Sequence, residues 1–460
     1  MCFIITRGQS EIYDILTHLT FLYIEACKIR NRMTDESGNL SAEWKQLSDT
    51  VQSLAKLNDE ALDRALWNLS KILGRTYQET KNTHLYLERG KQEAQGNSGL
   101  FQIILSLGEW IGGQESSKDE EILISFTSSL RDMIWHHAYG TRWANAVRAK
   151  LGDCTLQDRP LHVISANLHS ILNTLYGYGA TGNRRRDGSL EIRSPETSVA
   201  EARIRDFYDF IRTLRDKEEV IDNYSVNHGL IEHKDQTGSA IDIQIIDALG
   251  LIDVPLHPAV VIDKDYIRQV KPVIIVMDYA FGAQAFEVMD ELLKPMESGE
   301  KLDFASISIM GKAGTLVGLK GDIMIATAHV LEGTPHNYVV ENDLESSDFD
   351  GSTPVYQGPM VTVLGTSLQN LDVLEKFKTT SWNAVGLEME GGHYQRAISA
   401  AIIRGHILPD LKVRYAYYAS DNPIISGMTL ASGSMGEEGI LPTYSITNVI
   451  LGKILNPEGK

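Results

Sequence analysis

Apolar residues recur at every third or fourth position over the first third of the chain. This spacing matches the 3.6-residue period of an amphipathic helix. Examples are Ile12, Ile15, Leu16, Leu19, Leu22 and Tyr23, followed by similar stripes over 54–73 and 100–111. We therefore predict a mainly helical domain over residues 1–155.

The pattern changes after Pro272, where short and continuous apolar runs begin. The run Val273–Met277 is rich in β-branched residues and is typical of a strand buried on both faces. A turn over 278–282 and a helix over 286–293 follow it. Further strands are predicted over 307–310, 323–328, 361–364, 384–387 and 413–419, with a helix over 392–404. This alternation predicts an α/β domain over 256–460, with a mostly parallel sheet flanked by helices.

Residues 156–255 form a mixed segment that could complete the C-terminal core. Leu161–Ile164 is a predicted strand, and the polar turn Ser165–Asn167 and a helix ending at Tyr176 follow it. The glycine-containing loop over 177–188 carries three arginines, Arg184–Arg186, which form either a solvated turn or a phosphate contact. A charged amphipathic helix is predicted over 198–214.

Composition limits the classes of partner. The chain has 460 residues, more than one ordinary domain needs, and its 43% hydrophobic content is that of a globular protein. A formal charge of −18 repels nucleic-acid phosphates and anionic membranes, so neither is an expected partner.

Targeting and metal signals are also missing from the sequence. Its three cysteines show neither metal-ligand nor redox spacing, so we expect no metal and idle thiols in a reducing compartment. There is no signal-peptide pattern and no run of roughly 18 apolar residues that could span a bilayer. These features favour a cytoplasmic protein.

Two glycine-containing segments follow predicted strands. Gly282 lies in a turn before a helix, where backbone N–H groups can approach an anion or a sugar closely. Gly311, Ala313 and Gly314 follow Met310 and leave room for a flat base or a ribose. A plain turn and a glycine-rich hairpin are the structural alternatives.

Two carboxylates follow the predicted strand over 384–387. Glu388 and Glu390, separated by Met389, could accept hydrogen bonds from the two hydroxyls of a cis-diol, and the glycines after them would leave the diol unobstructed. The structural alternative is that a carboxylate caps the following helix.

A third carboxylate follows the predicted strand over 413–419. Asp421, flanked by Ser420 and Asn422, stands at the carboxyl end of a buried strand, where the functional residues of open α/β sheets lie. The sequence Asp-Asn-Pro is also a common turn.

Taken in chain order, these segments resemble the nucleoside phosphorylase and nucleosidase superfamily, and within it most closely the AMP nucleosidases. The resemblance extends from about residue 271 to the C-terminus. The residues that carry it are Gly282, Ile309–Leu316, Gly321-Asp322, Glu388-Met389-Glu390 and Ser420-Asp421.

The resemblance implies cleavage of the N-glycosidic bond of a purine nucleoside or nucleoside monophosphate, giving the free base and ribose or ribose phosphate. It implies that Glu390 binds the ribose hydroxyls, with Met389 on the sugar face and Glu388 nearby. Asp421, positioned by Ser420, would protonate purine N7 or form a hydrogen bond with it. The other positions implied in substrate binding are Gly282, Gly311, Ala313, Gly314 and Asn422. Family members usually form homo-oligomers, which we also expect here.

One part of the family pattern is missing before Lys271, namely the early motif that activates water or phosphate. Leu161–Ser165 could supply the strand of that motif, with Asn167, His169 and Arg184–Arg186 near it. No cofactor is expected, although phosphate could act as co-substrate or effector. Hydrolysis is preferred, and the alternatives are a phosphate-dependent phosphorylase and a non-catalytic nucleotide-binding regulatory module.

Overall fold

The structure is a computed structural model that describes residues 2–5, 9–35, 37–52, 58–89, 99–114, 123–126, 138–181, 218–296, 298–365, 371–425 and 437–459. The predicted helix over 198–214 and the arginines 184–186 lie outside these residues. The chain divides into two compact units, mainly residues 11–126 and residues 127–424 with 429–460. Each unit is described by itself.

The smaller unit is mainly helical, as predicted. Its elements are β1 (Cys2–Ile5), α1 (Gln9–Asn31), α2 (Ala42–Gln52), α3 (Asp59–Leu73), α4 (Tyr77–Arg89), α5 (Leu100–Gln114) and β2 (Leu123–Phe126). Trp44 of α2, Leu69 of α3 and Ile104 of α5 share one buried core, because each helix turns its apolar stripe inward. The short parallel pair of β1 and β2 was not predicted.

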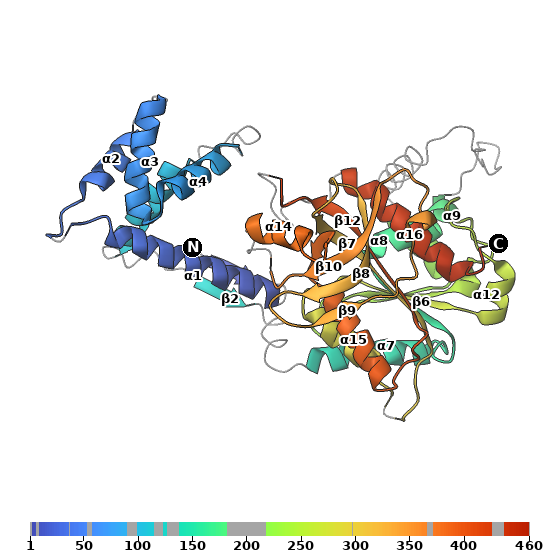
Figure 1. The fold of residues 1–460 in the computed structure, drawn as a ribbon. Coiled ribbons are helices and arrows are strands. Elements are labelled where there is room, and N and C mark those ends of the chain that lie inside the picture. Colours follow the sequence, from blue (N-terminus) through green and yellow to red (C-terminus); the bar gives the residue numbers. More distant parts are fainter. Residues whose placement is uncertain are drawn as a thin grey trace. The chain divides into compact units, whose positions relative to one another are not determined.

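The larger unit alternates strands and helices (Figure 1). Its strands are β3 (Leu161–Ser165), β4 (Leu230–His233), β5 (Ile243–Asp247), β6 (Val273–Met277), β7 (Phe304–Thr315), β8 (Ile323–Leu331), β9 (Asn337–Val339), β10 (Val355–Thr362), β11 (Gly386–Glu388) and β12 (Lys412–Asp421). Its α-helices are α7 (Ala138–Asp153), α8 (Leu168–Leu172), α9 (Tyr178–Thr181), α11 (Glu218–Val226), α12 (Lys264–Val270), α13 (Gln284–Leu292), α14 (Leu371–Thr379), α15 (Gly391–Ile403) and α16 (Ile440–Leu455). Shorter helical segments are η2 (Asn173–Gly177), η4 (Ala248–Leu251), η5 (Ser346–Asp348) and η6 (Glu437–Gly439).

One ten-stranded sheet forms the centre of this unit, in the order β11-β10-β8-β12-β7-β3-β6-β5-β4, with β9 beside β8. The pairings of β3 with β6 and β7, of β12 with β7, and of β10 with β8 and β11 are parallel. The β4–β5, β5–β6, β8–β9 and β8–β12 pairings are antiparallel. The predicted α/β class is confirmed, with a mixed sheet whose centre is parallel.

The long strand β7 closes part of this sheet into a ring. Its first half pairs with β3 and its residues 306–314 pair with β12, while its last two residues pair with β11 in the antiparallel sense. Because β11 also pairs with β10, strands β11, β10, β8, β12 and β7 form a closed circuit. The sequence predicts that this strand ends at Met310, but in the structure it continues through Gly311 to Thr315.

Helices cover both faces of the sheet. Residues of α7, α13 and α15 share one apolar core with one face, and residues of α8, α12 and α16 share a second core with the other (Figure 1). The predicted strand Leu161–Ile164 is confirmed as β3 at the centre of the sheet, where it lies between β6 and β7. The mixed segment therefore supplies a central strand, and its polar part forms α11, β4 and β5.

Helix α7, which lies in the predicted helical domain, packs against α13 in the larger unit. Arg148 of α7 donates to the carbonyl groups of Leu292 and Lys294, at 3.2 and 3.0 Å, and so satisfies the open end of α13. The division between the units accordingly falls earlier than residue 155, near residue 126.

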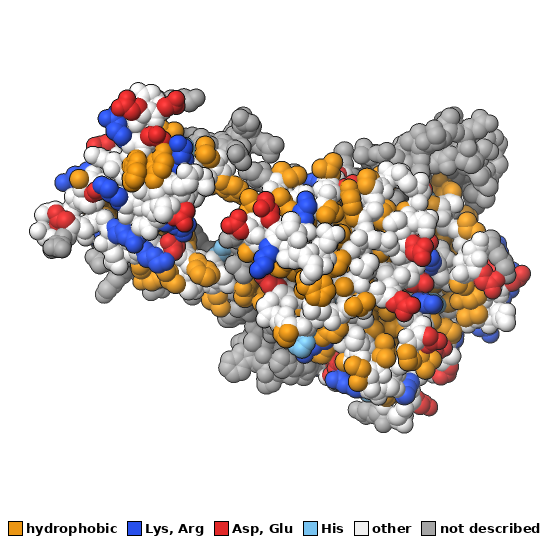
Figure 2. Space-filling model, viewed as in Figure 1, with side chains coloured by type: hydrophobic (Ala, Val, Ile, Leu, Met, Phe, Trp, Pro, Cys, Tyr) orange, Lys and Arg blue, Asp and Glu red, His pale blue; other side chains and the backbone are white. Residues whose placement is uncertain are grey.

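None of the helices in the described ranges is both long and apolar enough to cross a bilayer. On the face of the larger unit shown in Figure 2, acidic and basic side chains are interspersed.

Candidate active site

Gly314, near the end of β7, brings two distant parts of the chain together. It pairs with Leu387 of β11 on one side and with Asp421 of β12 on the other. Neighbouring strands lie about 4.8 Å apart, so the backbones of Leu387 and Asp421 are separated by at most about 10 Å across β7. The Glu-Met-Glu and Ser-Asp motifs therefore flank the same strand end.

The carboxylate of Glu388, the last residue of β11, is buried and is 3% exposed. Its Oε1 accepts a hydrogen bond from Thr362 Oγ1 of β10 and lies 3.2 Å from Nδ1 of His329 of β8. Its Oε2 accepts the backbone N–H of Glu390 at 2.6 Å and that of Gly391. Glu388 therefore caps the first turn of α15, which was the structural alternative to diol binding.

The charge of Glu388 is compensated by these donors. Burial by itself would raise the pKa of Glu388, but the hydrogen bond and charge of His329 and the hydrogen bonds from Thr362 and Gly391 lower it below its ordinary value. Glu388 is thus held as a carboxylate inside the protein.

The two glycines after Glu390 are required by close packing. A Cβ atom on Gly391 would overlap the ring of His329 and the hydroxyl of Tyr417, and one on Gly392 would lie 2.5 Å from Thr362 Oγ1. The sequence predicts that these glycines leave space for a diol. In the structure they leave space for the side chains around the helix cap.

Glu390 has a different environment from Glu388. It is half-buried, and its Oε1 accepts the backbone N–H of Gly282 at 2.9 Å, in the turn between β6 and α13. Gly282 has a φ of 53°, a left-handed conformation that favours glycine. Burial, reinforced by the negative charge of Glu388, raises the pKa of Glu390 to about 8. A carboxyl group with a strongly raised pKa at a strand end is a candidate functional group.

Asp421 is the last residue of β12 and is 5% exposed. The hydroxyl of Ser420 donates to its Oδ1 at 2.5 Å and also to the carbonyl of Ala313 at 3.3 Å. The register of β12 against β7 shifts between Ala419 and Asp421, as at a β-bulge, which is a common way to re-aim a side chain. Ser420 is therefore placed to fix the orientation of Asp421.

Asn422 forms the predicted turn. Its side-chain amide donates to the carbonyl of Gly318 at 2.9 Å, and its Oδ1 accepts the N–H of Ile424 at 3.0 Å. Both ends of the side chain therefore hold the turn together.

A second set of polar groups lies where β3 and β6 end. Ser165 Oγ is 2.9 Å from Tyr394 Oη of α15, and Tyr279, just after β6, forms hydrogen bonds with Asn167. Burial raises the pKa of Tyr279 to about 12, with Asp278 and Glu390 adding to it. Asn167 also caps α8 by accepting the N–H of Ser170 at 2.8 Å. These tyrosines are neutral hydrogen-bonding groups at physiological pH.

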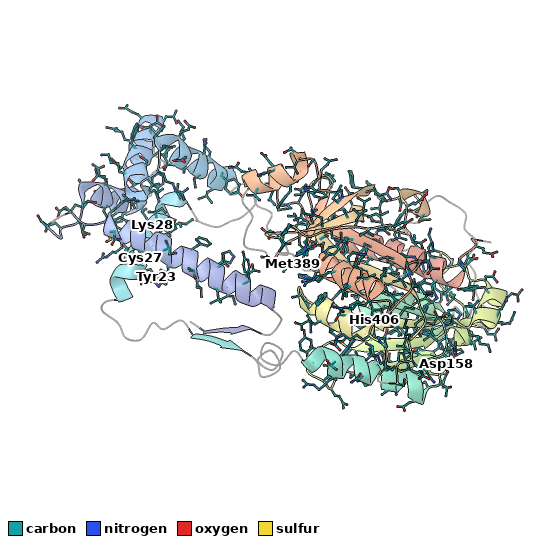
Figure 3. All side chains as sticks on the ribbon, turned by 60° about the horizontal axis from the view of Figure 1, so that its bottom comes forward. Tyr23, Cys27, Lys28, Asp158, Met389 and His406 are labelled. Atoms are coloured by element: carbon teal, nitrogen blue, oxygen red, sulfur yellow. The ribbon has the colours of Figure 1, made fainter. Side chains whose placement is uncertain are left out.

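The remaining predicted positions lie near the same strand end. Gly311 and Ala313 are inner residues of β7, and Met389 (Figure 3) is half-buried against the small apolar cluster that contains Leu387. No group of three or more His, Cys, Asp or Glu side chains in the described ranges is arranged to hold a metal ion.

Sequence reasoning did not identify His329, Thr362, Tyr279 or Tyr417. The one available signal was His329, a single ionisable residue inside the apolar strand Ile323–Leu331. Its partner Glu388 lies 59 positions away in the sequence, so the pair could not be recognised before the fold was known.

A family model described as "Family of unknown function (DUF6909)" matches residues 116–456. The chain belongs to this family. The match includes every residue of the candidate site and stops short of most of the helical unit. No curated protein matches the chain.

Several solved structures are similar to this DUF6909 protein. A putative methylthioadenosine nucleosidase from Weissella paramesenteroides is 11% identical, over 65% of this chain and 99% of that one, with a TM-score of 0.35. A methylthioadenosine/S-adenosylhomocysteine nucleosidase from Campylobacter jejuni is 10% identical, over 64% and 97%, with a TM-score of 0.34. A uridine phosphorylase from Schistosoma mansoni is 11% identical, over 68% and 90%, with a TM-score of 0.38. Identities and scores this low leave the assignment of function to the site residues.

Proposed function

We propose that this DUF6909 protein cleaves the N-glycosidic bond of a purine nucleoside or nucleoside 5′-monophosphate, as an AMP nucleosidase does. The observation that carries the proposal is the placement of Glu390 and Asp421. The first follows β11 and the second ends β12, and both strands pair with Gly314 of β7. A separation of at most about 10 Å between the two strands brings both carboxyl groups within reach of one nucleoside at the end of β7.

The residue types fit this chemistry. Breaking the bond builds positive charge on the sugar ring and negative charge on the leaving base, so groups at both ends of the nucleoside act on the transition state. Asp421, oriented by Ser420, would donate a proton to the base. Glu390 in its carboxylate form would accept the hydrogen bonds of the ribose hydroxyls, while its other oxygen accepts the backbone N–H of Gly282.

Water is the preferred acceptor of the sugar, and phosphate is the alternative. Purified protein should release free base from at least one of AMP, adenosine, inosine and methylthioadenosine, as measured by chromatography with and without phosphate. Release without phosphate supports hydrolysis, whereas release only with phosphate supports a phosphorylase. Asp421→Asn and Glu390→Gln are the variants expected to lose the activity, and absence of base at high protein concentration contradicts the proposal.

One observation favours a second candidate, a purine-binding regulatory module without turnover. Ser165 at the end of β3 and the two residues that follow it, Ala166 and Asn167, carry no ionisable side chain, and the Asn167 side chain already caps α8. This strand end therefore offers no carboxylate to activate water. Thermal stabilisation by a purine nucleoside or nucleotide without release of base would support this candidate.

A further inference from the structure

The cap of α15 is built by three strands. Thr362 Oγ1 donates to Glu388 and also accepts the N–H of Gly392 at 3.0 Å. Together with the two N–H groups that Glu388 accepts, this satisfies three successive donors at the start of the helix. The backbone of Glu390 is therefore fixed by side chains from β10 and β11.

His329 of β8 contacts the carboxylate of Glu388 and is the third side chain of this cap. It is 0% exposed, and the ring of Tyr415 lies edge-on to it with centroids 4.6 Å apart. Its Nδ1 faces the carboxylate of Glu388, so Nδ1 carries the hydrogen of this pair. Among the described residues none forms a hydrogen bond with Nε2 of His329. Within the described ranges, the His329 ring therefore forms its hydrogen bond with Glu388.

We propose that His329 and Thr362 are positioning residues, which hold Glu388 as the anion that caps α15 and thereby place Glu390 against Gly282. On this view the two acids of the Glu-Met-Glu motif have separate tasks. Glu388 is engaged on both oxygens by the protein, and Glu390 alone is available to a ligand. The inference rests on the proposed function only for the role of Glu390 toward a sugar.

The removal of His329 should loosen the first turn of α15. In His329→Leu, amide hydrogen exchange at Glu390 and Gly391 should accelerate about tenfold or more, because the capping carboxylate loses a donor. His162→Leu is the matched control, since His162 is also a buried strand histidine, with Nδ1 2.7 Å from Ser306 Oγ. It should leave exchange in α15 unchanged.

Conservative variants separate positioning from simple packing. An asparagine amide reaches about the place of Nδ1, and a glutamine amide about that of Nε2, so His329→Asn should retain the protection and His329→Gln should not. By the same reasoning, Thr362→Ser should retain it and Thr362→Val should lose it. If His329→Leu does not fold, these pairs still decide the question.

A double-mutant cycle gives a second readout. His329→Leu and Glu388→Gln remove the same interaction. The combined effect of the two substitutions on the unfolding equilibrium constant should therefore be about tenfold smaller than the product of their separate effects. Multiplicative effects, or equal protection in His329→Asn and His329→Gln, would overturn the proposal. These measurements need no substrate. A protein that releases no base would therefore contradict the proposed function and leave the positioning role standing.

Discussion

Glu390 should make the free energy of unfolding of this protein depend on pH, and the substitution Glu390→Gln should remove this dependence. Its pKa is raised from 4.5 to about 8 in the folded protein. Between these values the folded state keeps a proton that the unfolded state has lost, so the free energy of unfolding falls as pH rises. The contribution of this group is complete below pH 4.5 and is lost as pH rises through about 8.

The size of the effect follows from the shift. A pKa raised from 4.5 to about 8 corresponds to at most about 5 kcal/mol in the free energy of unfolding. Glu390→Gln has nearly the shape of the protonated acid and can still accept the N–H of Gly282. We therefore expect the variant to match the native protein near pH 5 and to be more stable than it near pH 9 by up to this amount.

Urea unfolding of both proteins at intervals from pH 5 to pH 9 measures this difference directly. Glu375→Gln, a substitution of an exposed glutamate on α14, is the control for the change of residue type. Glu388→Gln should weaken the effect, because the negative charge of Glu388 is the second cause of the shift after burial. Parallel curves for native protein and Glu390→Gln over the whole pH range would refute the reasoning.

Three further predictions concern the site. If the protein is a nucleosidase, its kcat/KM should rise with pH through about 8 as long as Asp421 keeps the proton that it donates, because Glu390 must be ionised to accept the hydroxyl hydrogen bonds. A kcat/KM that is constant between pH 6 and 8 argues against the sugar-binding role of Glu390. Asp421→Asn should lower kcat by about a hundredfold or more with little change in the thermal midpoint, and unchanged turnover would remove Asp421 from the mechanism. Gly391→Ala should lower the free energy of unfolding, measured in urea, by at least about 2 kcal/mol, because the added methyl group would overlap His329 and Tyr417. A decrease below about 0.5 kcal/mol would show that the cap is loosely packed.

The strands that sequence reasoning located are rich in apolar residues, and in Val273–Met277 the apolar run is continuous. Val273–Met277 is 0% exposed throughout, and burial on both faces leaves no polar position to interrupt the run. In contrast, β4 and β5 lie in a polar segment. In Leu230–His233, at the sheet edge, Leu230 is the one buried residue, and a strand of four residues with a single buried position has no apolar pattern that can be recognised.

The extent of β7 was misjudged for a different reason. Glycine at positions 311 and 314 is usual in turns, and the local sequence contains nothing to oppose that interpretation. Pairing with β12 on one side and with β11 beyond residue 313 keeps the chain extended. These pairings cannot be recognised from the local sequence, because both partner strands come at least 70 residues later in the chain.

The Glu-Met-Glu-Gly-Gly segment shows the same limit in the site itself. Two acids of one type, two positions apart, have pKa values displaced in opposite directions. The pKa of Glu388 is lowered by the hydrogen bonds that it accepts, whereas burial and the charge of Glu388 raise the pKa of Glu390 despite its backbone hydrogen bonds from Gly282 and Met389. Groups of one type whose pKa values are driven apart usually have different tasks. A stable anion is suited to capping a helix, whereas a carboxyl group that can gain or lose its proton near neutral pH is suited to meeting a ligand. The different tasks of the two acids are therefore set by their surroundings: His329 and Thr362 from other strands hold Glu388 as an anion, and burial together with the charge of Glu388 raises the pKa of Glu390.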